Sequence, residues 1–327
     1  MRTGRRSIAE VIFATLLCAV SATSARAAPA EDFPSQSIRI VVPFPPGGST
    51  DVIARILAEG MSRELGQSVV VDNRPGAATN IGSDYVARSK ADGYTLLFGG
   101  SALIVNSIFG PRPSFDPDEA LTSVSTVAEV PFMLATSPEA AFRTSREFVD
   151  AARSEPGKYS VASAQLDTYV ERFKMAAGVD VLHVPYKGGA QAVTDTLSSQ
   201  VDSAFALVPV VLPQIQAGKL RALGISSAKR LLPTLPEVPT FVENGVNFVM
   251  TVWYGVQAPS EIAGDRLDLL NQAVRKVVDA GDFASRLAEM GARAGSSTPK
   301  VMDRLFLQQR TDWEALSITH PELVQKP

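Results

Sequence analysis

The feature that most constrains the fold is a turn rich in proline and glycine, which separates a short apolar run from an amphipathic run. The apolar run, residues 38–42, is typical of a buried strand. The turn contains Pro45, Pro46, Gly47 and Gly48. After it, apolar side chains recur at the spacing of one helix face, at Val52, Ile53, Ile56, Leu57, Met61 and Leu65. The folded chain is therefore expected to open with a strand, a tight turn and a helix.

This turn has the features of an anion site. Gly47 and Gly48 let the backbone approach a ligand with no side chain in the way. Ser49 or Thr50 is expected to cap the helix, and Asp51 to stabilise the helix N-terminus and hold the loop. Backbone N–H groups at a helix N-terminus bind anions. Because neither a Walker loop nor a GxGxxG fingerprint is present, a small carboxylate fits better than a nucleotide. The alternative is a turn that binds nothing.

The strand–turn–helix pattern then recurs. Strands are expected at 67–71 and 94–98, and a helix is expected to start at Thr79 or Asn80. Since ligands bind at the carboxyl ends of strands in open α/β sheets, the three turns should face one crevice. An aromatic side chain there would cover the apolar part of a ligand. The candidate ligand-binding residues are Phe44, Pro46, Gly47, Gly48, Ser49, Thr50, Ala77, Ala78, Thr79, Asn80, Gly100, Ser101 and Ala102.

The middle of the chain repeats the alternation of strands and helices. Strands are expected at 159–163, 181–184, 203–207 and 220–225, with helices between them. Alternation at this spacing predicts an α/β fold with a mostly parallel sheet.

Extended segments on either side of this middle region divide the chain. They span residues 127–135 and 249–258, and only helices are expected after the second. If the second segment carries the chain back, these helices complete the first lobe. The expected domains are a first lobe of 28–131 plus 254–327 and a second lobe of 132–253. The two α/β lobes would be joined by a two-strand hinge, with a ligand cleft between them.

The N-terminus reads as a secretory signal peptide, residues 1–27. Arginines form a charged start, residues 11–20 are apolar, and Ala25-Arg26-Ala27 is a cleavage site. The apolar stretch is shorter than the roughly 20 residues that span a bilayer. Cys18, the only cysteine, would be lost on cleavage. A bacterial periplasmic protein is expected. The formal net charge is −3 and no long basic run is present, so no nucleic-acid partner is expected.

Six motifs follow one another along the mature chain. They are IVVPFPPGGSTD at 40–51, VVDNRPGA at 70–77, ADGYTL at 91–96, HVPYKGG at 183–189, GKLRAL at 218–223 and WYG at 253–255. Their order and spacing resemble the Bug family, the substrate-binding proteins of tripartite tricarboxylate transporters. The resemblance implies a type II periplasmic binding-protein fold. It also implies a small organic acid held by backbone N–H groups and ordered waters, transient partnership with membrane permease subunits, and no cofactor. A monomer is expected.

Two departures from the family pattern lie in the second lobe. Residues 160–169 lack the usual glycines and histidine, and Phe205-Ala206-Leu207 stands where Phe-Asp-Asn is common. The loss of that carboxylate suggests an aromatic or aliphatic acid over an amino acid. Lys187 either pairs with a ligand carboxylate or is an exposed turn residue. The second-lobe candidates are Ser163, Ala164, Gln165, Asp167, Thr168, Tyr186, Lys187, Gly188, Ala206 and Leu207.

No catalytic residue or metal site is predicted. His183 and His320 are the only histidines, and no nucleophile signature such as GxSxG accompanies them. No cluster of His, Cys and carboxylates has metal-ligand spacing. The leading hypothesis is a periplasmic receptor that delivers an organic acid to a membrane transporter. The alternatives are a solute sensor that reports to a membrane signalling protein and a periplasmic enzyme.

Overall fold

The structure is a computed structural model that describes residues 33–164, 167–186 and 188–324. The predicted signal peptide, residues 1–27, lies outside this range. Residues from Gln36 onward form one compact unit.

The folded chain opens with β–α units, as the apolar periodicity predicts. Their elements are β1 (Ile38–Val42), α2 (Ser49–Leu65), β2 (Val69–Asn73), α3 (Asn80–Ala87), β3 (Thr95–Gly100) and α4 (Ser101–Phe109). A short helix, α5 (Pro117–Ala120), leads into the long strand β4 (Leu121–Thr136).

The middle of the chain alternates helices and strands, and the tail is mainly helical. The middle elements are α6 (Ser145–Ser154), β5 (Ser160–Ala164), α7 (Asp167–Ala177), β6 (Leu182–Tyr186), α8 (Gly189–Leu197), β7 (Ser203–Leu207), α9 (Val208–Gln216) and β8 (Arg221–Ile225). The later elements are β9 (Thr251–Pro259), α10 (Gly264–Val278), α11 (Gly281–Glu289), β10 (Arg293–Ala294), α12 (Pro299–Thr319) and the 3-10 turn η1 (Pro321–Leu323).

The strands lie in the order β2-β1-β3-β9-β4-β7-β5-β6, with β8 and β10 also paired to β4. Strand β1 is parallel to β2 and β3, and β5 is parallel to β6 and β7. Every pairing of β4 and β9 is antiparallel. The expectation of a mostly parallel sheet is therefore wrong, because these two strands run against the β–α units on both sides.

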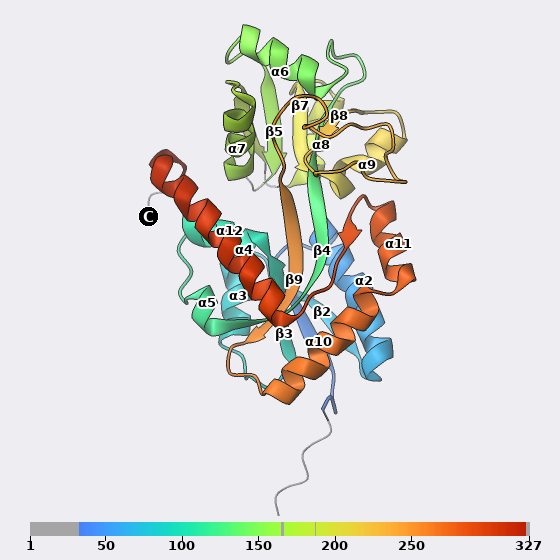
Figure 1. The fold of residues 1–327 in the computed structure, drawn as a ribbon, viewed down its shortest axis with the longest axis vertical. Coiled ribbons are helices and arrows are strands. Elements are labelled where there is room, and N and C mark those ends of the chain that lie inside the picture. Colours follow the sequence, from blue (N-terminus) through green and yellow to red (C-terminus); the bar gives the residue numbers. More distant parts are fainter. Residues whose placement is uncertain (1–32, 165–166, 187, 325–327) are drawn as a thin grey trace, which may run out of the picture. The chain divides into compact units, whose positions relative to one another are not determined.

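Strand β4 belongs to two groups of strands. Its residues Leu121–Pro131 pair with β9, and its residues Phe132–Thr136 pair with β7. We call lobe 1 the part built on β1, β2, β3, β9, β10 and Leu121–Pro131, and lobe 2 the part built on β5 to β8 and Phe132–Thr136 (Figure 1). The domain limits expected from the sequence stay a prediction.

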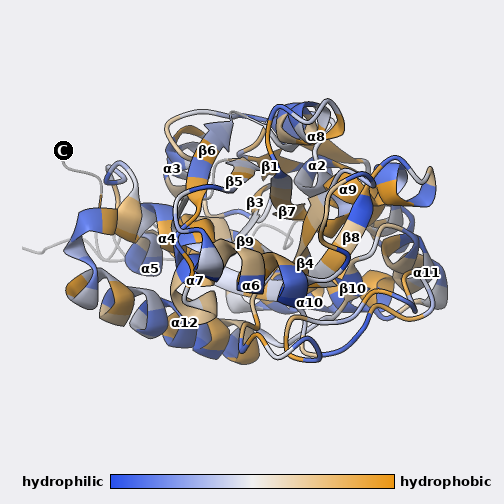
Figure 2. Cartoon of the chain, turned by 90° about the horizontal axis from the view of Figure 1, so that it is seen from above, coloured by the Kyte–Doolittle hydropathy of each residue, from blue (hydrophilic) through white to orange (hydrophobic). Residues whose placement is uncertain are grey.

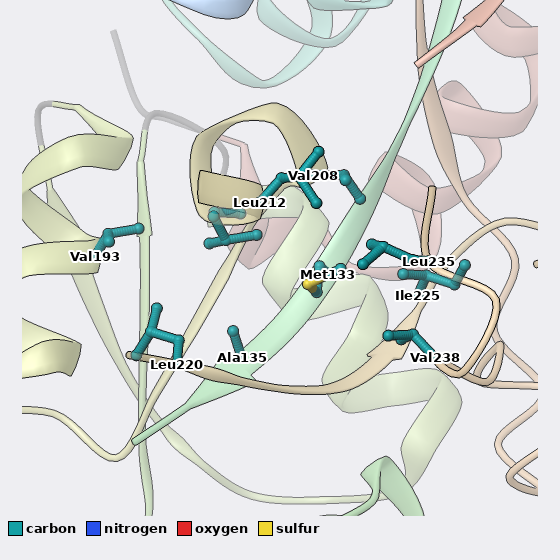
Figure 3. Close-up of a cluster of buried hydrophobic side chains, with 11 residues drawn as sticks. Met133, Ala135, Val193, Val208, Leu212, Leu220, Ile225, Leu235 and Val238 are labelled. Carbon is teal, nitrogen blue, oxygen red and sulfur yellow. The ribbon is translucent and has the colours of Figure 1, made fainter. Parts of the chain in front are cut away.

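Helices cover both lobes with their apolar faces turned inward. Helix α10 packs on α2 and β4, and α12 packs on α4 and β4. Hydrophilic and hydrophobic residues alternate along α12 (Figure 2). In lobe 2, Met133 of β4 lies in a buried cluster with Val208 and Leu212 of α9 and Ile225 of β8 (Figure 3). These contacts hold the strands in place. The turns that follow the strands are held in place with them.

Ser226 ties together the two segments that connect the lobes. It is fully buried. Its hydroxyl accepts a hydrogen bond from the Phe132 N–H at 2.8 Å and donates to the Met250 carbonyl. Its own N–H donates to the Phe132 carbonyl, and the Met250 N–H donates to its carbonyl. Since Phe132 is where β4 enters lobe 2 and Met250 directly precedes β9, Ser226 sets the spacing of both segments.

We expect Ser226→Ala to lower the free energy of unfolding by about 1–3 kcal/mol, because it leaves a buried N–H and a buried carbonyl without their hydroxyl partner. Urea denaturation measures the change. Ser227→Ala is the matched control, since among the described residues the neighbouring Ser227 hydroxyl donates to the carbonyl of Lys229 alone. Equal stability of both variants would contradict the prediction.

Candidate functional site

The turn after β1 is held by the carboxylate of Asp51. This side chain is buried, and it accepts hydrogen bonds from the Gly47 N–H at 2.9 Å, Arg55 Nε at 3.0 Å and Asn73 Nδ2 at 2.9 Å. Burial opposes ionisation, but the hydrogen bonds from Arg55, Gly47 and Asn73 outweigh it and lower the pKa of Asp51. The expectation that Asp51 holds the loop is confirmed.

This arrangement corrects two expectations about the first helix. The Gly47 N–H donates to Asp51, so it is not the free donor that the sequence suggested. The residue at the N-cap of α2 is Gly48 in an extended conformation, so neither Ser49 nor Thr50 caps the helix. The side chains of Ser49 and Thr50 instead hydrogen-bond to the buried phenol of Tyr254. Burial raises the pKa of Tyr254, and these two hydrogen bonds oppose the rise.

A cleft of about 690 Å³ is lined by residues of both lobes. Lobe 1 contributes three segments, namely the start of the turn after β1, the turn before α3, and α4 with the residues that follow it. Lobe 2 contributes Thr168, Pro185 and Tyr186. The predicted residues that line this cleft are Phe44, Ala77, Ala78, Thr79, Ala102, Thr168 and Tyr186.

The turn before α3 has an unusual backbone. Gly76, Ala77, Ala78 and Thr79 have φ values of 127°, 46°, 51° and 78°, so three residues with side chains lie in the left-handed region. Such conformations cost of the order of 1–3 kcal/mol each and cluster at ligand clamps. In the described part of the chain, the N–H groups of Ala77, Ala78 and Thr79 donate no hydrogen bond. Successive free N–H groups in a turn form a concavity that binds anions.

Helix α4 supplies three cleft residues that sequence reasoning missed, Val105, Asn106 and Phe109. Ala102, Val105, Asn106 and Phe109 line the cleft from one face of this helix. Their spacing of i, i+3, i+4 and i+7 is the signal that could have identified them. The Asn106 amide also donates to the Ala78 carbonyl at 2.8 Å, so α4 braces the strained turn.

A smaller cavity of about 10 Å³ shares Phe44, Thr79 and Ala102 with the cleft and reaches Ser83 and Tyr254. The hydroxyls of Thr79 and Ser83 are buried and have no hydrogen-bond partner among the described residues. A space of this size holds about one water molecule. The small cavity is therefore a mainly apolar recess directly beside the cleft, with these two hydroxyls in its wall.

Gly100 lines this recess, and its backbone requires glycine. Its φ is 149°, and a Cβ there would lie 2.1 Å from the carbonyl oxygen of Trp253. The next residue, Ser101, is buried, and its hydroxyl accepts a hydrogen bond from the Trp253 N–H at 3.0 Å. These two predicted residues dock β3 and α4 against β9.

The lobe 2 wall carries its own hydrogen bonds. The Tyr186 hydroxyl donates to Asp195 Oδ2 at 2.6 Å, and this bond raises the pKa of Tyr186. The Ser163 hydroxyl is buried and lies 2.7 Å from His183 Nε2. Thr168, at the start of α7, is almost fully buried beside the cleft.

Other predicted residues lie elsewhere. Ala206 pairs with Met133, packs in the lobe 2 core and is absent from the described lining of the cleft. Among described residues, the predicted members that do not line the cleft are Pro46, Gly47, Gly48, Ser49, Thr50, Asn80, Gly100, Ser101, Ser163, Ala164, Gly188, Ala206 and Leu207. Gln165, Lys187 and the side chain of Asp167 lie outside the described residues, so these predictions stay open.

The cleft is neutral in the described part of the chain, where no lining residue carries a charge. Within the same residues, no group of His, Cys, Asp and Glu side chains is arranged to hold a metal ion. None of the helices in residues 33–164, 167–186 and 188–324 has the length and apolar character needed to span a membrane.

Comparison with known proteins identifies the family. A family model described as the tripartite tricarboxylate transporter family receptor matches residues 53–318. The chain belongs to this family. BugT of Bordetella pertussis (strain Tohama I) is 37% identical over 287 residues, which cover 85% of this chain and 88% of BugT. The predicted resemblance to Bug proteins is therefore confirmed.

Solved structures agree with the two-lobed fold. MatC from Rhodopseudomonas palustris with bound malate is 29% identical with a TM-score of 0.75, and covers 86% of this chain and 99% of MatC. An R. palustris protein with adipate is 32% identical with a TM-score of 0.81, over 88% of this chain and 98% of that protein. Members of the receptor family are periplasmic solute-binding proteins, and the α/β binding-protein fold predicted from the sequence is confirmed.

We expect Asp51→Asn to lower the free energy of unfolding by about 1–3 kcal/mol at neutral pH, since buried donors lose a charged partner. The folded-state pKa of Asp51 lies below its ordinary value of 3.8, so its contribution is present above that value and is lost as the pH falls through the folded-state pKa. The stability difference between wild type and variant should therefore shrink below about pH 4.

Denaturant unfolding at pH 7 and pH 3 measures this difference. Glu119→Gln, at an exposed acid, is the control for a general charge effect. A difference for Asp51→Asn that stays constant between the two pH values would contradict the assignment.

Proposed function

We propose that the protein is a periplasmic solute-binding receptor that captures a small organic acid in this cleft and delivers it, as a monomer, to the permease of a tripartite tricarboxylate-type transporter. The observation that carries the proposal is a cleft that is lined by both lobes and is neutral in its described part. Its wall contains a strained turn whose N–H groups donate no hydrogen bond among the described residues.

One carboxylate of the ligand lies against the turn formed by Ala77, Ala78 and Thr79. Their N–H groups supply neutral donors, and the N-terminus of α3 adds a favourable dipole. The recess holding the Thr79 and Ser83 hydroxyls admits one water that bridges to the same carboxylate. The adipate and malate in the similar structures are carboxylates, which supports this ligand class.

The rest of the cleft suits an apolar body. Phe44, Val105, Phe109, Pro111 and Pro185 line it, and no described lining residue is a carboxylate that could pair with an ammonium group. An aliphatic or aromatic acid therefore fits better than an amino acid. The support for this preference comes from α4 and the adjoining turns, and not from Ala206.

The two lobes close around the bound ligand. A ligand that contacts both lobes binds the closed arrangement more tightly than the open one, because only the closed one brings both lobes against it. This difference in affinity shifts the equilibrium toward closure. That closed arrangement is the one the permease would recognise.

Export to the periplasm is expected from the signal sequence and agrees with the location of the family members. Gln165, Asp167 and Lys187 stay predicted ligand contacts in lobe 2.

The first test is a panel of acids read out by thermal unfolding. We expect different rises in Tm for adipate, malate, benzoate and aspartate. The largest rise should come from an acid that carries an apolar body. At 100 times its dissociation constant such a ligand adds about 2.7 kcal/mol of stability. The matching primary amides, which lack the anion, are controls. Stabilisation by aspartate alone would refute the preference, and stabilisation by no acid would refute the proposed function.

The second test concerns the brace on the strained turn. Asn106→Ala removes the hydrogen bond to the Ala78 carbonyl, so the turn is less firmly held and the affinity for the acid should fall about fivefold, the equivalent of about 1 kcal/mol. Isothermal titration measures it. Ser107→Ala on the same helix is the control, because its hydroxyl bonds to the Ile104 carbonyl. Equal affinities in the two variants would contradict the role of the turn.

A further inference from the structure

Trp313 of α12 contacts both lobes although it does not line the cleft. Its side chain is buried, with a relative exposure of 3%. Its ring packs edge-on against Phe109 of α4 in lobe 1, with centroids 5.7 Å apart. The same ring packs edge-on against Tyr169 of α7 in lobe 2, with centroids 5.2 Å apart. One side chain therefore bridges the two lobes.

The lobe 2 side of this contact is buried. The Arg172 guanidinium lies 4.6 Å from the Trp313 ring centroid, and burial lowers the pKa of Arg172. The Tyr169 hydroxyl is buried with no hydrogen-bond partner in the described part of the chain. Tyr169 also packs on Phe132, the residue at which β4 enters lobe 2. The contact thus runs from the cleft wall to the hinge.

The lobe 1 side of the contact is the cleft wall itself. Phe109 lines the cleft, and Trp313 packs against its ring. Protein interiors are close-packed, so the position of Phe109 depends on the volume of the side chain that supports it. A smaller side chain at position 313 would let Phe109 withdraw from the cleft and would loosen its link to α7.

We propose that Trp313 is a positioning residue for ligand selection, which holds Phe109 as the cleft wall and couples that wall to α7 of lobe 2. This inference rests on the proposed function as an organic-acid receptor. The size of the acid that fits is then set in part by a residue that the ligand does not touch.

The test is a pair of matched variants, Trp313→Phe and Trp253→Phe. Both tryptophans are buried, and Trp253 packs edge-on against Phe306 of α12 within lobe 1. The dissociation constants of butanoate and octanoate are measured for wild type and both variants. In Trp313→Phe the preference should shift toward octanoate by about tenfold, the discrimination that about one methylene gives in a fitted pocket. In Trp253→Phe it should stay at the wild-type value.

A structural role alone would lower the Tm of both variants without changing the preference, and that result would overturn the inference. Because the chain has two tryptophans, Trp253→Phe also leaves Trp313 as its single indole fluorophore. Its emission should shift when octanoate binds, even if Trp313→Phe does not fold. An unchanged emission at saturation would overturn the inference. Wild type that binds neither these acids nor those of the panel would refute the proposed function and this inference with it.

Discussion

The structure depends on one strand that serves two sheets. β4 has 16 residues, of which the first part pairs with β9 in lobe 1 and the last part with β7 and β8 in lobe 2. A strand in a ladder cannot slip by one residue without turning its buried face outward, so the register is fixed in both lobes. Ser226 adds hydrogen bonds at the point of crossing. The two halves of the cleft are therefore positioned by backbone hydrogen bonding.

A cleft that is neutral in its described part can hold an anion when its donors are fixed in advance. Bringing a carboxylate out of water is costly, and hydrogen bonds to an ionised acceptor offset this cost more strongly than those to a neutral one. The strained turn at Ala77, Ala78 and Thr79 keeps three N–H groups free, and Asn106 braces it. In the turn after β1, by contrast, the protein supplies its own anion, since Asp51 takes the Gly47 N–H. Two turns of similar sequence character thus differ in whether their N–H groups already have a partner among the described residues.

Periodicity predicted the elements well and the direction of side chains less well. Strand 203–207 was placed as the structure has it, because an apolar run of five residues has the length of a strand and is too short for a typical helix. The role of Ala206 stays a prediction; alternation along β7 turns its side chain toward the core cluster, and no local signal says which face of a central strand meets a ligand. Val105, Asn106 and Phe109 were missed although their spacing marks one helix face. The N-cap is Gly48 and not Ser49 or Thr50, whose side chains contact Tyr254, a residue distant in sequence that no local pattern could reveal.

The lobes also touch on the other flank of β4, which limits how they can move. Gly291, after α11, packs so closely on α9 that a Cβ would lie 2.3 Å from Val208 Cγ1. Nearby, the Thr234 hydroxyl donates to the Ala288 carbonyl. In Figure 1 the α11–α9 side and the α12–α7 side flank the crossing strands. A hinge motion about β4 and β9 has to break or repack these contacts between the lobes. Since packed interfaces switch between discrete arrangements and do not deform continuously, these two contacts confine the lobes to few relative positions.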